Sequence, residues 1–100
     1  MIKGTVLYGH PKDADAFEKY YNETHLSLVA KTNGVVKAEY TKFLPGPDGS
    51  APAYYRMAEL YFGGPAEMQQ ALTSPEGQAM AADLANFATG GATIIFGTVE

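Results

Sequence analysis

The stretch that decides the fold is FEKYYNETHLSLV, residues 17–29. Its apolar and aromatic side chains recur with the i, i+3, i+4, i+7 spacing of a helix that buries one face. They are Phe17, Tyr20, Tyr21, Thr24, Leu28 and Val29. His25 shares this face, so we expect its imidazole to point inward, where a polar ring needs a partner or a ligand. The stretch therefore predicts an amphipathic helix with one buried titratable group.

The boundaries of this helix are also marked in the sequence. Asp13 or Asp15 can cap its start, because a short carboxylate accepts hydrogen bonds from the free amides of the first turn. We expect the helix to continue to about Lys31 and to stop at Asn33-Gly34, a pair that tolerates a left-handed backbone.

Strands are predicted on both sides of the helix from β-forming composition and alternating polarity. They cover residues 2–8, 35–43, 53–62 and 92–99. A second helical region follows the third strand, restarts at Ser74-Pro75 with a serine cap, and ends before a loop over residues 86–91. Its inward side chains are predicted to be Met68, Ala71, Leu72, Met80, Leu84 and Phe87. Residues 44–52, with three prolines and two glycines, form the only long loop.

The resulting order, β-α-β-β-α-β, predicts one ferredoxin-like α+β domain over residues 1–100, with a four-stranded antiparallel sheet and helices on one face. The first, third and fourth strands carry apolar residues on both sides. A small monomer would leave that second sheet face bare, which soluble monomers rarely tolerate. We therefore expect a homodimer in which two sheets pack face to face.

The composition narrows the function classes. Seven Lys and Arg against eleven Asp and Glu give a net charge of −4, and no basic patch appears, so nucleic-acid binding is not expected. The absence of cysteine excludes disulfides, thiolate catalysis and cysteine-bound metals. No membrane-spanning run or signal peptide is apparent, so a soluble cytoplasmic protein is the expectation. Dinucleotide-binding, phosphate-loop and serine-hydrolase motifs are also absent.

The chain resembles the EthD family, which is named after ethyl tert-butyl ether degradation and belongs to the dimeric α+β barrel superfamily. Several segments carry this resemblance and follow one another in the same order. They are Val6-Leu7-Tyr8 with His10-Pro11, Phe17-x-x-Tyr20-Tyr21-x-x-Thr24-His25-x-x-Leu28, Tyr54–Phe62, Ser74-Pro75-Glu76-Gly77 and Ala82–Ala88. The resemblance implies two ferredoxin-like subunits that form a barrel, each with a cleft between helices and sheet. The superfamily includes cofactor-free monooxygenases, isomerases, dehydratases and haem-binding proteins, and the fold alone does not choose among them.

His25 is the first candidate for a functional residue. It can serve as a general acid or base toward a phenol, ketone or lactone because the histidine pKa lies near neutrality. The alternative is a neutral core histidine bonded to a carbonyl or a tyrosine. His10 lies in the turn after the first strand, at the expected rim of the cleft. Two histidines without a clear third ligand do not predict a metal site.

The expected substrate-binding residues around His25 are Tyr8, His10, Tyr21, Arg56, Asp83, Asn86 and Phe87. Each has a plainer alternative. The aromatic residues fit a small core equally well. Arg56, in a mostly apolar strand face, suggests either an anionic ligand group or an ion pair with Glu39 or Asp83. Asp83 and Asn86 can orient His25 or a ligand, and Asn86 can instead cap its helix.

Two functions remain open from the sequence. The first is a cofactor-independent oxidoreductase, isomerase or dehydratase that acts on a small hydrophobic, aromatic or lactone-type metabolite and uses His25 for proton transfer. The second is a non-catalytic carrier or accessory protein for an oxidative degradation or biosynthetic pathway. Haem binding through His25 or His10 is a third, weaker alternative. No cofactor is assigned.

Overall fold

The computed structural model describes residues 1–100, and its elements follow the predicted order. They are β1 (Ile2–Tyr8), α1 (Ala14–Tyr20), the π-helical turn η1 (Tyr21–His25), α2 (Leu26–Lys31), β2 (Lys37–Lys42), β3 (Arg56–Phe62), α3 (Pro65–Thr73), α4 (Pro75–Phe87) and β4 (Ala92–Thr98). The expected strands over residues 35–43, 53–62 and 92–99 were too long by one to three residues at their ends.

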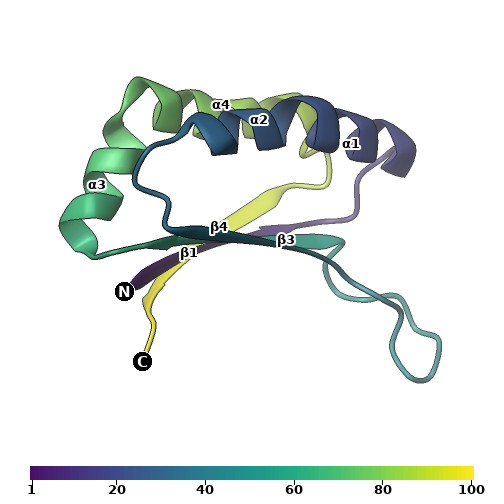
Figure 1. The fold of residues 1–100 in the computed structure, drawn as a ribbon. Helices are drawn as coiled ribbons and strands as arrows, with labels where there is room; N and C mark the ends of the chain where they lie inside the picture. The colour runs from purple at the N-terminus through teal and green to yellow at the C-terminus, as the bar shows by residue number, and fades with distance from the viewer.

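The four strands form one antiparallel sheet in the order β2-β3-β1-β4. The helices all lie on one face of this sheet, as Figure 1 shows. The predicted ferredoxin-like α+β fold is therefore confirmed. None of the helices has both the length and the apolar composition that a membrane crossing requires. The cytoplasmic location stays a prediction.

The predicted amphipathic helix is continuous from Ala14 to Lys31, through α1, η1 and α2. Asp13 caps it, and its side chain accepts a hydrogen bond from the Ala16 amide at 3.0 Å. The helix ends just before Gly34, whose φ of 97° is the left-handed conformation that glycine adopts without strain. Both predicted boundaries are close to the observed ones.

The turn η1 sets the direction of the inward side chains. Its wider hydrogen-bonding pattern brings the Leu26 amide to the Tyr21 carbonyl, five residues earlier. In a regular α-helix, every fourth position drifts by about 40° around the axis. Here the buried positions recur at every fourth residue without interruption: Phe17, Tyr21, His25 and Val29. Thr24, expected to face inward, is exposed instead.

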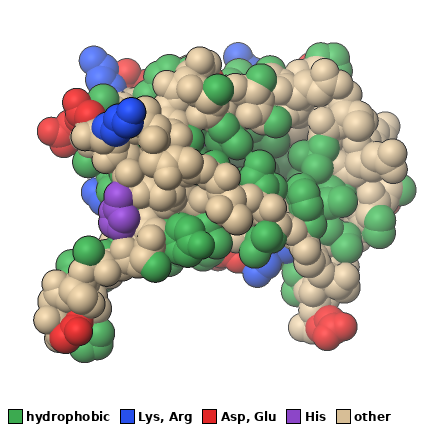
Figure 2. Space-filling model, turned by 180° about the vertical axis from the view of Figure 1, so that it is seen from behind, with side chains coloured by type: hydrophobic (Ala, Val, Ile, Leu, Met, Phe, Trp, Pro, Cys, Tyr) green, Lys and Arg blue, Asp and Glu red, His purple; other side chains and the backbone are tan.

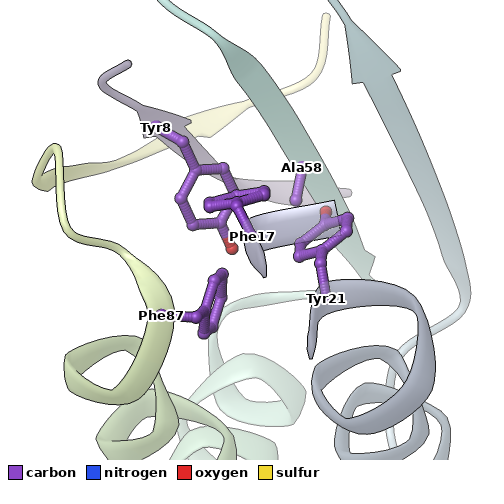
Figure 3. Packing of buried hydrophobic residues seen from close by; sticks show 5 residues of the cluster. All are labelled: Tyr8, Phe17, Tyr21, Ala58 and Phe87. Atoms are coloured by element: carbon purple, nitrogen blue, oxygen red, sulfur yellow. The ribbon is translucent and has the colours of Figure 1, made fainter. Parts of the chain in front are cut away.

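The core between the helices and the sheet has two parts. The aromatic cluster consists of Tyr8, Phe17, Tyr21, Ala58 and Phe87 and is shown in Figure 3. The aliphatic-rich cluster consists of Val29, Leu60, Phe62, Ala71 and Met80. The Ser74 hydroxyl caps α4 by accepting a hydrogen bond from the Gly77 amide at 3.1 Å, as predicted, and α4 supplies side chains to both clusters.

The strand β4 is the least covered part of the sheet. Every residue in it is exposed, and Ile94, Ile95 and Phe96 each leave about half of their surface in water (46%, 53% and 53%). The opposite face of the sheet carries no helix (Figure 1). There, an ion pair joins Lys3 to Glu59 at 2.8 Å. The single chain therefore leaves the apolar side chains of β4 uncovered.

Candidate functional site

An apolar cavity of about 180 Å³ lies between the helix layer and the sheet, with 14 hydrophobic residues among the 16 that line it. All four strands contribute to its floor, and η1, α2, α3 and α4 contribute to its roof. Figure 2 looks at the β4 side and shows hydrophobic side chains around a hollow between the two layers. Gly4 matters here because a Cβ atom at this position would lie 3.0 Å from the ring of Phe96, which lines the cavity.

His25 is the main polar group in the cavity wall. It is only 4% exposed, and its Nδ1 atom lies 2.8 Å from the Asp83 carboxylate on α4. The second oxygen of Asp83 accepts hydrogen bonds from the Tyr20 hydroxyl at 2.5 Å and from the Asn86 amide at 2.9 Å. Asp83 is thus fully engaged behind the imidazole, which fixes the position of the ring.

The charge state of this pair follows from its surroundings. Burial of Asp83 acts to raise its pKa, but the hydrogen bonds from Tyr20, Asn86 and His25 outweigh burial and lower the pKa. Burial lowers the pKa of His25 in spite of the opposing effect of Asp83. A neutral imidazole beside an ionised carboxylate carries its proton on Nδ1. The Nε2 atom of His25 makes no hydrogen bond within the protein and is left as a proton acceptor.

Two tyrosines line the cavity beside His25. The Tyr21 ring stacks on the imidazole with a centroid separation of 5.8 Å and an interplanar angle of 20°. Tyr8 meets Tyr21 edge-on at 5.7 Å. Burial is the main reason that the pKa of each phenol is raised, so both hydroxyls remain protonated at neutral pH.

The structure brings together most of the residues selected from the sequence. Tyr8, Tyr21 and His25 line the cavity. Asp83 and Asn86 lie behind His25, as described above. Phe87 packs against the imidazole with a centroid separation of 4.6 Å. The cavity therefore lies beneath the first helix, where the sequence predicts a cleft, and the functional roles of these residues stay a prediction.

Two of the selected residues lie elsewhere. His10 is exposed, and its Nε2 atom lies 2.7 Å from the Pro52 carbonyl oxygen at the base of the long loop. Arg56 forms a two-pronged ion pair with Glu18 at 2.9 and 2.7 Å. The predicted ion pair of Arg56 with Glu39 or Asp83 is therefore not formed, because Arg56 faces α1. Glu39 instead accepts a hydrogen bond from Tyr61 at 2.9 Å.

Sequence reasoning missed the role of Tyr20 as a partner of Asp83. It also did not anticipate the cavity-lining positions of Gly4, Tyr40 and Ile94. The three-residue spacing of Asp83 and Asn86 on one helix face was an available signal for a polar cluster. The contact with Tyr20 joins residues 63 positions apart and had no local signal.

Comparison with known proteins gives a consistent assignment. Residues 10–91 match the model of the EthD domain. A Rhodococcus erythropolis protein, described as an uncharacterized 11.0 kDa protein of the thcB–thcC intergenic region, is 44% identical over 96 residues, which are 96% of this chain and 92% of the relative.

Solved structures agree with this assignment. An ethyl tert-butyl ether degradation (EthD) family protein from Bacillus halodurans is 32% identical with a TM-score of 0.93, covering 100% of this chain and 99% of that one. A dimeric ferredoxin-like protein of unknown function from Bacteroides fragilis, 17% identical with a TM-score of 0.69 over 98% of this chain and 95% of its own, shares the fold. With the family model covering most of its length, this chain belongs to the EthD family.

Proposed function

We propose that the protein binds a small, neutral and largely apolar metabolite in the cavity and that His25 accepts a proton from it. The observation that carries this proposal is the free Nε2 atom of a buried histidine in an otherwise apolar cavity, with an ionised Asp83 behind its Nδ1 atom. A proton taken up at Nε2 would create an imidazolium, and the Asp83 carboxylate would stabilise its charge.

The size of the cavity favours a ligand of one ring. A dry apolar cavity of roughly 150 Å³ holds a benzene molecule. The present cavity, at about 180 Å³, is close to that value. It lies well below the roughly 300–1,000 Å³ of sites for drug-sized ligands. These volumes favour a single ring with a few substituents over a macrocycle such as haem.

The charge of the lining favours a neutral ligand. No Lys, Arg, Asp or Glu lines the cavity. Arg56 lies over the ring of Tyr21, a lining residue, at 5.0 Å, but its guanidinium is already paired with Glu18. A ligand carboxylate or phosphate would therefore lose its hydration without gaining a counter-charge, which is costly. Ketones, phenols and lactones do not carry this cost.

The two functions left open by the sequence differ in what happens after binding. Isomerisation and dehydration both begin with removal of a proton, which is the step proposed for His25. A carrier or accessory protein would use the same cavity and would hold the ligand unchanged. The oxidoreductase alternative stays a prediction that rests on the family resemblance.

A chromophoric phenol separates these possibilities. The anion of para-nitrophenol absorbs at longer wavelength than the neutral phenol, so its spectrum reports proton transfer directly. At a pH where the free phenol is mostly neutral, we expect the wild-type protein to increase the anion band on binding. His25→Gln should bind without that increase, and His10→Gln, which changes the other histidine, should behave like the wild type.

The outcomes bear differently on the proposal. Binding with no increase of the anion band in the wild type would support the carrier alternative. An equal increase in His25→Gln would contradict the role of His25. Failure of the wild type to bind para-nitrophenol or any other one-ring ligand would contradict the assignment of the cavity as a binding site.

We also propose that two copies pack through the uncovered sheet face. On β4, Ile94 and Phe96 line the cavity, so Ile95 points to the opposite face, where it is 53% exposed. Burying such apolar surface against a second copy would remove it from water. Sedimentation should give a dimer mass for the wild type and for Thr24→Lys on the exposed helix surface, and a lower mass for Ile95→Lys. A monomeric wild type would contradict this proposal.

A further inference from the structure

The cavity opens to solvent between α4 and β4. Most of its lining residues are buried or half-buried, and four are exposed, namely Tyr40, Ala81, Ile94 and Phe96. Three of these four lie on α4 and β4. Figure 2 shows the hollow on this side, with hydrophobic side chains around it. Tyr40 lies on β2 at the opposite edge of the sheet, so the main opening is on the β4 side.

The rim of this opening on β4, formed by Ile94 and Phe96, is apolar. These two side chains line the cavity and still leave 46% and 53% of their surface in water. Residues 92–99 contain no charged side chain, whereas the other edge strand, β2, has three in six residues. Charged side chains are one means by which proteins keep an edge strand from unwanted contacts. The β4 rim lacks this protection and is suited to contact with an apolar group.

Gly4 shapes the floor of the cavity next to the β4 rim. It lies on β1, the strand beside β4, and pairs with Phe96 in the register of the sheet. A Cβ atom at this position would lie 3.0 Å from the Phe96 ring and 3.8 Å from the Phe62 ring. Because glycine has no side chain, the Phe96 ring can lie against β1 and the cavity floor stays clear up to the rim.

His25 lies at the buried inner end of the same cavity. The residue is 4% exposed, and its Nε2 atom makes no hydrogen bond within the protein. The only buried side-chain polar atoms without a partner are the hydroxyls of Tyr21 and Tyr55. Nε2 is therefore open to the cavity, where a ligand can reach it. One space thus joins a polar inner end at His25 to an apolar outer end at the β4 rim.

An enclosed volume of about 180 Å³ holds one ring, so a longer substituent has to extend through the opening. From this arrangement we infer that the ligand carries an apolar chain opposite its acidic group, and that this chain lies on the β4 rim. The inference rests on the proposed function and narrows the ligand class to neutral, one-ring compounds with an alkyl chain. A charged substituent would lose its water at the rim without gaining a partner.

Four probes with the same phenol group test this inference. They are phenol, para-ethylphenol, para-butylphenol and para-methoxyethylphenol, in which an ether oxygen replaces one methylene group of the butyl chain. Their affinities would be measured by calorimetry for the wild type, Ile94→Ser, Phe96→Ser and Leu44→Ser. Leu44 is 79% exposed and does not line the cavity, so its variant controls for the loss of an exposed apolar side chain.

In the wild type we expect the affinity to rise about twofold for each methylene group, since a chain lying on a surface is about half buried. Para-butylphenol should then bind about fifteenfold more tightly than phenol, and para-methoxyethylphenol should bind little better than phenol. Each rim variant should bind phenol normally and reduce the fifteenfold gain to less than about fivefold. Leu44→Ser should match the wild type.

A second measurement reports the contact itself and needs no substitution. The terminal methyl group of bound para-butylphenol should give nuclear Overhauser contacts to the side chain of Ile94. The next residue, Ile95, is exposed to a similar extent (53%) but points to the opposite face of the sheet, so it should give none. A general change in packing would not produce this difference.

The two levels of the proposal fail in different ways. An equal gain from phenol to para-butylphenol in the wild type and both rim variants, or the absence of contacts to Ile94, would overturn the inference about the rim. A flat dependence on chain length, with a lower mass of Phe96→Ser in sedimentation, would also overturn it and assign the rim to a second copy of the chain. The ionisation of para-nitrophenol by His25 would still support the proposed function in each case. Failure of all four phenols to bind would overturn the proposed function, and the inference with it.

Discussion

The two clusters of the core differ in the side chains that they bury. The aliphatic-rich cluster buries Val29, Leu60, Phe62, Ala71 and Met80 and contains no unpartnered polar atom. The aromatic cluster instead borders the imidazole of His25 and includes a phenol whose oxygen has no partner. Burying polar groups is costly unless they are fully hydrogen-bonded. The difference indicates that the first cluster supplies stability, while the second holds buried polar groups at a cost in stability.

The largest expected effect lies in the aliphatic-rich cluster. Phe62 is 1% exposed, and Phe62→Ala should lower the free energy of unfolding by about 3–5 kcal/mol through lost burial and the space left behind. Urea unfolding measures this change. Thr24→Ala, on the exposed side of the helix, should change the same quantity by less than about 0.5 kcal/mol. Similar values for the two variants would contradict the role of this cluster.

The Asp83 network should give the next largest effect. Asp83→Asn replaces a carboxylate that accepts three hydrogen bonds by an amide that must itself donate, so we expect a loss of about 1–3 kcal/mol. The control is Asp15→Asn in the exposed first turn of α1, which should cost no more than about 1 kcal/mol. Urea unfolding of both variants measures the difference, and equal losses would show that the network adds nothing to stability.

The same network predicts how stability depends on pH. The folded-state pKa of His25 is lowered, so below about pH 6.5 the unfolded chain binds a proton that the folded chain resists. Stability is then complete above the unfolded pKa and falls as the pH decreases through this range. Thermal unfolding between roughly pH 7 and 5.5 should show that fall in the wild type and in His10→Gln. If the stability of His25→Gln fell with decreasing pH as steeply as that of the wild type, His25 would not be the cause of the fall.

The smallest expected effect separates two adjacent tyrosines. Tyr21→Phe removes a buried hydroxyl without a partner, so it should leave the free energy of unfolding unchanged or raise it by up to about 1 kcal/mol. Tyr20→Phe removes the donor to Asp83 and should lower the free energy of unfolding. Urea unfolding of the two variants provides the comparison. A larger loss for Tyr21→Phe would mean that its hydroxyl has a partner in the folded protein.

The fold was predictable from the sequence because its signals are local. The alternation in residues 53–62 puts Ala58, Leu60 and Phe62 on one face of the strand, and this is the buried face of β3. The helix limits followed from Asp13 and from the Asn33-Gly34 pair. Each of these signals depends on neighbours a few positions away, so the sequence displays them directly.

The site was predictable in part. The inward direction of His25 followed from helical spacing. Its carboxylate partner, Asp83, comes from α4, and Tyr20 reaches this carboxylate only because the two helices pack together. The ion pair of Arg56 with Glu18 likewise depends on how α1 crosses β3. Such contacts are set by the relative placement of whole elements, which a pattern within one element does not record.

The π-helical turn η1 also determines the helical phase of everything that follows it. Each residue of a π-helical turn rotates the chain around the helix axis by a smaller angle than a residue of an α-helix does. The turn therefore changes the direction of the side chains that follow it without breaking the helix. Removing one residue between Tyr21 and His25 would allow regular α-helical hydrogen bonding to resume. In the shortened helix the imidazole would follow Phe17 by seven positions and Val29 would follow it by eleven, which at about 100° per residue places both within about 20° of Phe17. The wider turn therefore absorbs one extra residue while the imidazole, the phenol and Val29 keep facing the sheet together.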